Sequence, residues 1–182
     1  MNWKENLPAL KFLGIFLGVY LMGNLLYGFF IELNYPVADP ITHWVSNQSA
    51  GLINLLSGRG TKSILSEVSP VTLILENGRS VLRIYEGCNG INVMIVFVAF
   101  VLSFGGFSKR GSIFILVGII VIHLANLCRI TLLFWVAKNY QSYFYYVHKY
   151  IFTAALYVIV LALWWVWVYR IMKATTKASH ER

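Results

Sequence analysis

Charged residues are scarce in this sequence: they make up only 12% of its 182 residues. A soluble globular domain normally carries about 25% charged residues. Hydrophobic residues reach 58%, and the mean hydropathy is +0.67. This combination argues against an ordinary soluble domain and indicates a protein embedded in lipid.

Several functional motifs are also missing. The two cysteines, Cys88 and Cys128, have neither a CxxC partner nor the spacing of a zinc site. A Walker loop, an HExxH motif and a dinucleotide fingerprint are absent, so we expect no cofactor and no metal. The net charge of +8 does not indicate a nucleic-acid partner, because the basic residues flank long apolar runs, where cations orient membrane helices.

Four apolar stretches have the length of a membrane-spanning helix, which is about 17–25 residues. We expect these spans at about 12–31, 91–107, 112–136 and 150–169. The first is too long for the core of a signal peptide, about 7–15 residues, and is interpreted as a retained anchor. The sequence thus predicts an all-α integral membrane protein of about four transmembrane helices, with a single membrane domain over 1–182.

Basic residues near the span ends predict the orientation in the membrane. Three clusters flank the spans: Lys4 and Lys11; Lys109 and Arg110; Arg170, Lys173, Lys177 and Arg182. Placing all three in the cytoplasm satisfies the positive-inside rule. Both termini are then cytoplasmic, and segments 32–88 and 137–149 face outward, although these outer segments also carry some basic residues.

The long outer segment 32–88 contains signals for two local structures. Asp39-Pro40 can begin a helix, since proline favours the first helical position, and the mixed pattern of 41–56 suits a short interfacial helix. Two strand-like runs within 71–85 flank Asn77-Gly78. This dipeptide strongly indicates a type I′ turn, so we expect an extracytoplasmic β-hairpin over 71–85.

Three polar residues that are distant in the sequence are expected at one depth in the membrane. Cys88 begins the second span at its outer end, and His148 stands at the outer entry to the fourth. The third span runs outward from Lys109, so Arg129 lies about 28 Å farther along at 1.5 Å per residue. That distance places Arg129 close to the outer hydrocarbon boundary.

A thiol, a guanidinium and an imidazole in one place can carry out acyl transfer through a thioester. An ionised thiol is a strong nucleophile, and a nearby histidine can stabilise the thiolate or act as the general base. The same histidine can later protonate a leaving amine. The planar guanidinium can bind an oxyanion or a carbonyl. Cys88, Arg129 and His148 are therefore our candidate catalytic residues.

Each candidate also has an ordinary structural interpretation. Cys88 alone could be a small buried hydrophobic residue, Arg129 a snorkelling cation and His148 a member of an interfacial aromatic belt. Arg129, however, lies inside an apolar run, where a charge at mid-bilayer costs up to about 2.5–3.5 kcal/mol.

Other polar residues on the third span are expected to be structural. His123 and Asn126 suit interhelical hydrogen bonds, and Asn126 is also one turn from Arg129 and could orient it. Cys128 faces a different side of the helix from Asn126, although the sequence leaves a Cys88–Cys128 disulfide open.

Three runs of the sequence resemble the motifs of the exosortase/archaeosortase family. Glu86-Gly87-Cys88-Asn89-Gly90-Ile91-Asn92 resembles the first motif, a Cys followed by a small polar residue and a Gly at a helix start. Asn126-Leu127-Cys128-Arg129-Ile130 resembles the second, which ends in the essential Arg, and His148 before a final apolar span matches the third. The resemblance covers roughly residues 65–170 and suggests a short member, of the exosortase F type.

The resemblance implies a cysteine peptidase or transpeptidase in the bacterial cytoplasmic (inner) membrane, with its active site on the outer, periplasmic face. Its partners would be membrane lipid and exported proteins with a C-terminal sorting signal, composed of a short motif, a transmembrane helix and a basic end. The resemblance makes Cys88 the nucleophile, Arg129 the transition-state stabiliser and His148 the general acid/base. Supporting positions are Asn126, Asn89 and Gly90. Many members carry Ser in place of Asn89, and larger members have more spans.

Two other classes of function remain open from the sequence. A non-enzymatic membrane scaffold, or assembly factor for surface protein or polysaccharide export, would leave Cys88 dispensable. A small transporter is disfavoured, because few polar residues lie at the expected midplane and no paired broken helices are evident.

Overall fold

The computed structural model describes residues 3–58 and 60–180; Arg182, one of the basic residues expected in the cytoplasm, lies outside them. The helices are α1 (Trp3–Glu32), α2 (Pro40–Ser57), α3 (Ile91–Ser103), α4 (Lys109–Asn139), α5 (Phe144–Tyr146) and α6 (Phe152–His180). The short helical turns are η1 (Glu86–Cys88), η2 (Gln141–Tyr143) and η3 (Val147–Ile151). The strands are β1 (Lys62–Leu65), β2 (Thr72–Glu76) and β3 (Arg79–Ile84).

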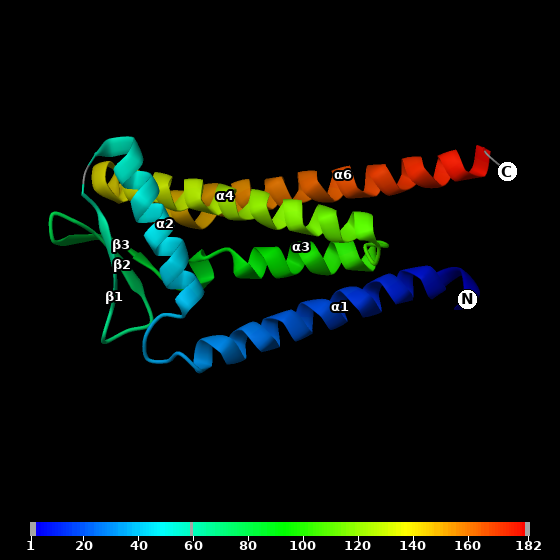
Figure 1. Ribbon diagram of the computed structural model, residues 1–182, viewed down its shortest axis with the longest axis horizontal. Helices are drawn as coiled ribbons and strands as arrows, with labels where there is room; N and C mark the ends of the chain where they lie inside the picture. The colour runs from blue at the N-terminus through cyan, green and yellow to red at the C-terminus, as the bar shows by residue number, and fades with distance from the viewer. Residues whose placement is uncertain (1–2, 59, 181–182) are drawn as a thin grey trace.

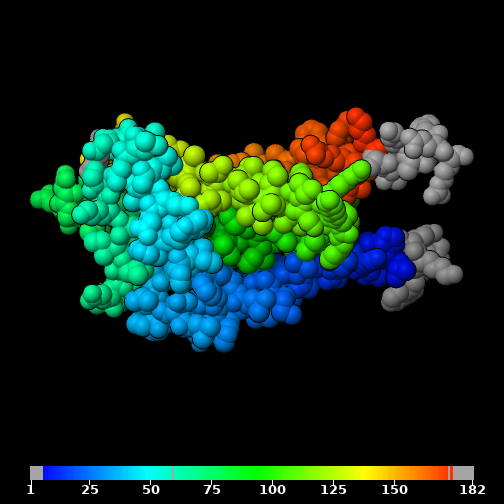
Figure 2. Space-filling model, in the orientation of Figure 1, coloured from blue at the N-terminus to red at the C-terminus, as the bar shows by residue number. Residues whose placement is uncertain are grey.

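Four helices run side by side along the long axis of the molecule, as Figure 1 shows for α1, α3, α4 and α6. The sheet, α2 and the connection between α4 and α6 gather at one end, whereas the α3–α4 turn lies at the other end with both termini. In Figure 2, α3 is set back between α1 and α4. The two segments predicted to share one side of the membrane, 32–88 and 137–149, therefore lie at the same end of the bundle, called here the sheet end.

The apolar helices confirm the predicted class of fold. Among the described residues, three helical stretches are long and apolar enough to cross a membrane: Asn6–Glu32, Lys109–Asn139 and Gln141–Ile171. The fourth apolar helix, Ile91–Ser103, is shorter. Many of their large apolar side chains are exposed, as expected for surfaces that face lipid. The chain is a multi-pass membrane protein.

The second helix is shorter than the predicted span 91–107. α3 ends at Ser103 because Phe104 leaves the helical conformation (ψ 40°) and Gly105 adopts a positive φ of 83°. Thirteen residues rise only about 20 Å, which is less than the roughly 30 Å hydrocarbon thickness. Apolar composition continues to Phe107, so the sequence pattern alone overestimated the helix.

The predicted hairpin is confirmed, and the structure adds one strand to it. Asn77 and Gly78 both have positive φ, 51° and 77°, as a type I′ turn requires. β2 pairs antiparallel with β3, and β1, which the sequence did not predict, pairs antiparallel with β2. Leu82 and Ile84 are buried while Arg83 is exposed, so the hairpin turns one apolar face toward the helices.

The helix predicted after Asp39-Pro40 is confirmed as α2. The Asp39 carboxylate accepts hydrogen bonds from the backbone N–H groups of Ile41 (2.9 Å) and Thr42 (3.0 Å), which caps the helix. One face of α2 is buried against α4, β1 and β2. Trp44 remains 54% exposed, as expected of an interfacial side chain.

We expect Gly118→Ala to destabilise the bundle. A Cβ atom at Gly118 of α4 would overlap the buried ring of Phe97 in α3, and such overpacking typically costs about 1–3 kcal/mol. The matched control is Gly14→Ala in α1, where a Cβ would meet nothing within 4 Å. Thermal unfolding in detergent should show a lower Tm for the first variant only; equal Tm values would contradict the close α3–α4 contact.

Candidate active site

Cys88 lies in η1, in the short connection between the hairpin and α3. Its side chain is only 5% exposed and belongs to an apolar cluster at the sheet end of the bundle. The cluster includes Ile84 from β3 and Ile130 and Phe134 from α4. The hairpin, the η1 turn and α4 thus enclose the thiol together.

Asn126 of α4 forms hydrogen bonds with both Cys88 and Arg129. Its Nδ2 donates to the backbone carbonyl of Cys88 (2.9 Å), and its Oδ1 accepts from Nη1 of Arg129 (3.3 Å). The Asn126 side chain also packs on Gly90, which has a positive φ of 88° and where a Cβ would lie 3.3 Å from Asn126. Gly90 therefore allows the backbone of the cysteine turn to approach α4 closely.

Arg129 is buried, with 9% of its surface exposed. Its guanidinium forms a hydrogen bond with the Cys88 side chain and interacts electrostatically with both Cys88 and His148. The buried Nε has no hydrogen-bond partner among the described residues. A buried cation with an unused donor beside a thiol is suited to bind a substrate oxygen.

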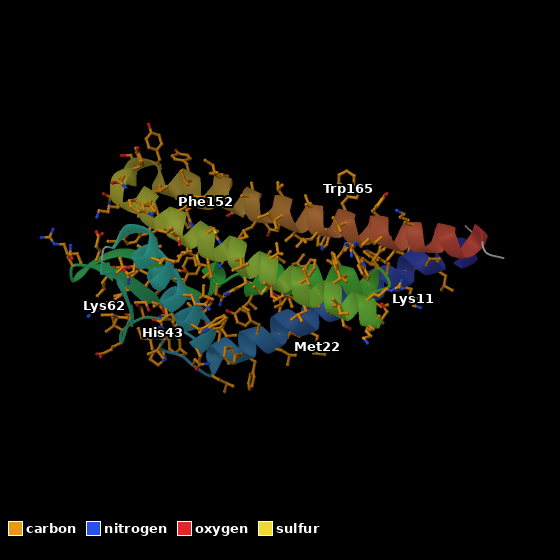
Figure 3. All side chains as sticks on the ribbon, turned by 45° about the horizontal axis from the view of Figure 1, so that its top comes forward. Lys11, Met22, His43, Lys62, Phe152 and Trp165 are labelled. Atoms are coloured by element: carbon orange, nitrogen blue, oxygen red, sulfur yellow. The ribbon has the colours of Figure 1, made fainter. Side chains whose placement is uncertain are left out.

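His148 stands in η3, a π-helical turn that connects α5 to α6. Its ring stacks on Phe144 with the ring centroids 5.7 Å apart, and the Thr153 hydroxyl donates to its backbone carbonyl (3.2 Å). Phe144 and Phe152, on either side of it in sequence, both pack on the apolar cluster that contains Cys88. Figure 3 labels Phe152 on the part of α6 nearer the sheet end and Trp165 farther along the helix.

The Nδ1 atom of His148 is buried and has no hydrogen-bond partner within the described part of the chain. Within the described residues, His148 and Cys88 share no direct hydrogen bond. Arg129 interacts electrostatically with both of them. π-Turns often occur at functional sites. The structure thus brings the imidazole to the sheet end, within electrostatic range of Arg129, and leaves its Nδ1 without a hydrogen-bond partner among the described residues.

Tyr85, the last residue of the predicted hairpin range 71–85, is a further residue at this site. Its ring folds back over Gly87, so that a Cβ at that glycine would lie 2.6 Å from a ring carbon. The Tyr85 and Cys88 side chains share a hydrogen bond, and the Cys88 N–H donates to the Tyr85 carbonyl (2.8 Å). The glycine before the cysteine is the signal that could have suggested this contact.

Burial raises the pKa of the Cys88 thiol above its ordinary value. The charge of Arg129 and the hydrogen bonds from Tyr85 and Arg129 act in the opposite direction and offset only part of the effect. The Tyr85 hydroxyl has a raised pKa, first because of the charge on Cys88 and then because of burial. The thiol is therefore protonated at neutral pH, and the tyrosine remains a hydrogen-bond donor.

A buried polar network holds the other side of the cysteine turn. The Asn89 amide Nδ2 donates to the Tyr27 hydroxyl of α1 (2.5 Å) and to the Thr42 hydroxyl of α2 (2.8 Å), while Oδ1 accepts from the N–H of Ile91 (3.0 Å). The Thr42 hydroxyl in turn donates to the Asp39 carboxylate (2.5 Å). Asn89, Thr42 and Asp39 are each at most 1% exposed, so this network ties the turn to both α1 and α2.

The remaining polar residues of α4 have interhelical roles. His123 Nε2 forms a hydrogen bond with Gln48 Oε1 (2.8 Å), and its ring stacks on Trp44 of α2. Both cysteines are free, and Cys128 is exposed whereas Cys88 is buried. Among the described residues, no three His, Cys, Asp or Glu side chains are grouped to hold a metal ion.

A cavity of about 360 Å³ lies beside the site, between β3 and the end of α4. Its lining includes Leu82, which belongs to the cluster around Cys88, and Phe144, which stacks on His148. Ser80, Arg83 and Gln141 add polar groups to the lining. Cys88, Arg129 and His148 are not among the lining residues, so the cavity adjoins the cluster around the thiol without containing the candidate residues.

Comparison with known proteins identifies one family. The family model described as "Transmembrane exosortase (Exosortase_EpsH)" matches residues 7–166. This range runs from α1 into α6 and includes Cys88, Arg129 and His148. No curated protein and no solved structure matches the chain.

We expect Tyr85→Phe to make Cys88 less reactive at neutral pH. The hydrogen bond from Tyr85 lowers the thiol pKa, so removing the hydroxyl raises this pKa further and reduces the thiolate fraction at a given pH. Alkylation rates of Cys88, measured against pH in a Cys128→Ala background, should shift to higher pH. The exposed tyrosine at the end of α4 supplies the control, Tyr140→Phe; identical shifts, or none, would contradict the contact.

Proposed function

We propose a function for this chain from the family to which it belongs, the transmembrane exosortases. Membership implies a transmembrane sorting protease. The chain acts, in this proposal, as a cysteine protease or transpeptidase that cleaves the C-terminal sorting tails of exported proteins through a thioester. The described residues form four apolar helices, of which three are long enough to cross a membrane. From this small number we further propose a short member of the exosortase F type with a single membrane domain.

One observation carries the proposal: the buried thiol, the guanidinium and the imidazole gather at the sheet end of the bundle. Cys88, Arg129 and His148 come from three separate elements, η1, α4 and η3. Arg129 interacts with both of the others. A buried cation among apolar helices is costly, and a role in catalysis gives a reason to keep it.

The proposed reaction begins with a neutral thiol, because burial raises the pKa of Cys88. His148 accepts the thiol proton as sulfur attacks the scissile carbonyl carbon, and Arg129 stabilises the resulting oxyanion. The C–N bond then breaks, and His148 returns the proton to the leaving amine. Water or an acceptor nucleophile then attacks the thioester carbonyl and loses a proton to His148. The C–S bond breaks, and His148 returns this proton to sulfur, which regenerates the Cys88 thiol.

The cavity between β3 and α4 is the proposed binding place for the residues around the cleaved bond. It adjoins both the apolar cluster of Cys88 and the Phe144–His148 stack. The sorting tail's own transmembrane helix would remain in lipid beside the bundle. Its short motif would then reach the cavity at the membrane surface.

The proposed location is the bacterial cytoplasmic membrane, with both termini in the cytoplasm and the active site on the periplasmic face. The basic residues Lys109, Arg110 and Arg170 support it, since they belong to the end of the bundle opposite the sheet. Cations in short connections favour the cytoplasmic side.

The direct test compares Cys88→Ala with Cys128→Ala in cells that express a protein with a C-terminal sorting tail. We expect processing of the tail, followed by its change in mass, to be abolished in Cys88→Ala and retained in Cys128→Ala. Both variants should accumulate in the membrane, because both cysteines are free and neither substitution breaks a disulfide.

Unchanged processing in Cys88→Ala would overturn the proposal and favour a non-enzymatic scaffold. Loss of tail processing in both variants would indicate that removing a thiol disrupts the fold and does not act on the catalytic step.

A further inference from the structure

A second site lies at the opposite end of the bundle from Cys88. A groove of about 870 Å³ runs between the first turns of α4 and the later turns of α6. Its apolar walls include Ile113, Val117 and Val166, which are each between 44% and 56% exposed. The groove therefore opens sideways, toward the space that lipid occupies around the bundle.

The floor of the groove is rigid. Trp167 is only 5% exposed, and its ring stacks on Phe114 with the ring centroids 4.9 Å apart. Its indole Nε1 donates to the Phe104 carbonyl (3.3 Å) at the end of α3. These contacts hold the floor of a groove that is lined by α4, α6 and the α3–α4 turn, so the groove does not depend on flexible side chains alone.

Two arginines line the polar end of the groove: Arg110 from α4 and Arg170 from α6. The sequence contains no Asp or Glu between Glu86 and Glu181. The described parts of α3, α4 and α6 therefore offer these guanidinium groups no carboxylate. Two cations that share a groove without a counterion on the same helices favour an anionic occupant.

The rise along the helices separates the two arginines from the sheet end by about the thickness of a hydrocarbon core. The rise along α6 from Phe152 to Arg170 is about 27 Å, and that along α4 from Arg110 to Arg129 is about 28 Å. Both values approach the roughly 30 Å thickness of the hydrocarbon core. If one end of the bundle lies at one membrane surface, the arginine pair lies near the other, whichever surface that is.

We propose that this groove binds one anionic phospholipid. The phosphate lies between Arg110 and Arg170, whose planar guanidinium groups can each form paired hydrogen bonds with phosphate oxygens. An acyl chain follows the apolar wall along Ile113, Val117 and Val166. Basic pockets between transmembrane helices are known to suit anionic headgroups, and a helix of a neighbouring protein would leave the two cations without a partner unless it were acidic.

The test is native mass spectrometry of the full-length protein from vesicles of equal parts phosphatidylglycerol and phosphatidylcholine. We expect the wild-type protein to retain one phosphatidylglycerol in preference to phosphatidylcholine. The double variant Arg110→Gln/Arg170→Gln should lose this preference, and Arg110→Lys/Arg170→Lys should keep part of it through charge alone. Lys62→Gln/Arg79→Gln, which removes two exposed cations of the sheet, should behave like the wild type.

Equal retention of both lipids by the wild type, or an unchanged preference in the Arg→Gln double variant, would overturn the proposal. Displacement of the bound lipid by glycerophosphate, which lacks acyl chains, would show that the apolar wall contributes nothing. Capture of an acidic protein segment in place of lipid would assign the groove to a protein partner. Thermal unfolding of each variant in detergent separates loss of binding from loss of fold.

Discussion

The hydrogen bonds of Asn126 are the constraint on which the site depends. One buried amide donates to the Cys88 carbonyl and accepts from the Arg129 guanidinium. It thereby fixes the cysteine turn to α4 and orients the cation toward the same place. An unsatisfied buried polar group costs about 1–3 kcal/mol, so loss of either hydrogen bond would destabilise the site. Gly90 completes the contact, because its missing side chain leaves room for the amide.

The surroundings of this amide explain how a small bundle can maintain a polar site. On one side the Asn89 network extends to Thr42 and Tyr27, so α1 and α2 both hold the turn. On the other side the thiol belongs to a cluster of apolar residues from the hairpin, α2 and α4. Low polarity strengthens the interaction of Arg129 with its neighbours, and the same burial raises the thiol pKa. The nucleophile therefore needs a base at the moment of reaction.

Local signals in the sequence predicted the hairpin and the start of α2, whereas other features of the site depend on tertiary contacts. Asn77-Gly78 predicted the hairpin and Asp39-Pro40 the start of α2, because turn and capping preferences act within a few residues. Counting rise per residue placed Arg129 at the depth of Cys88. The π-turn around His148 and the short β1 strand were not predicted, because periodicity carries no signal for the packing between separate elements on which they depend. The fold of Tyr85 over the cysteine turn is local, and Gly87 is its signal in the sequence.

The most direct test of the account is the labelling of Cys88 from outside intact cells with a small membrane-impermeant thiol reagent. The measurement uses Cys128→Ala protein and follows the rate against pH, with and without His148→Ala. The account predicts labelling from outside, with a rate near neutral pH that falls when the imidazole is removed, because the neutral thiol needs a base. Labelling only from the cytoplasmic side, or a pH profile that does not depend on His148, would contradict the proposed orientation or the proposed Cys–His chemistry.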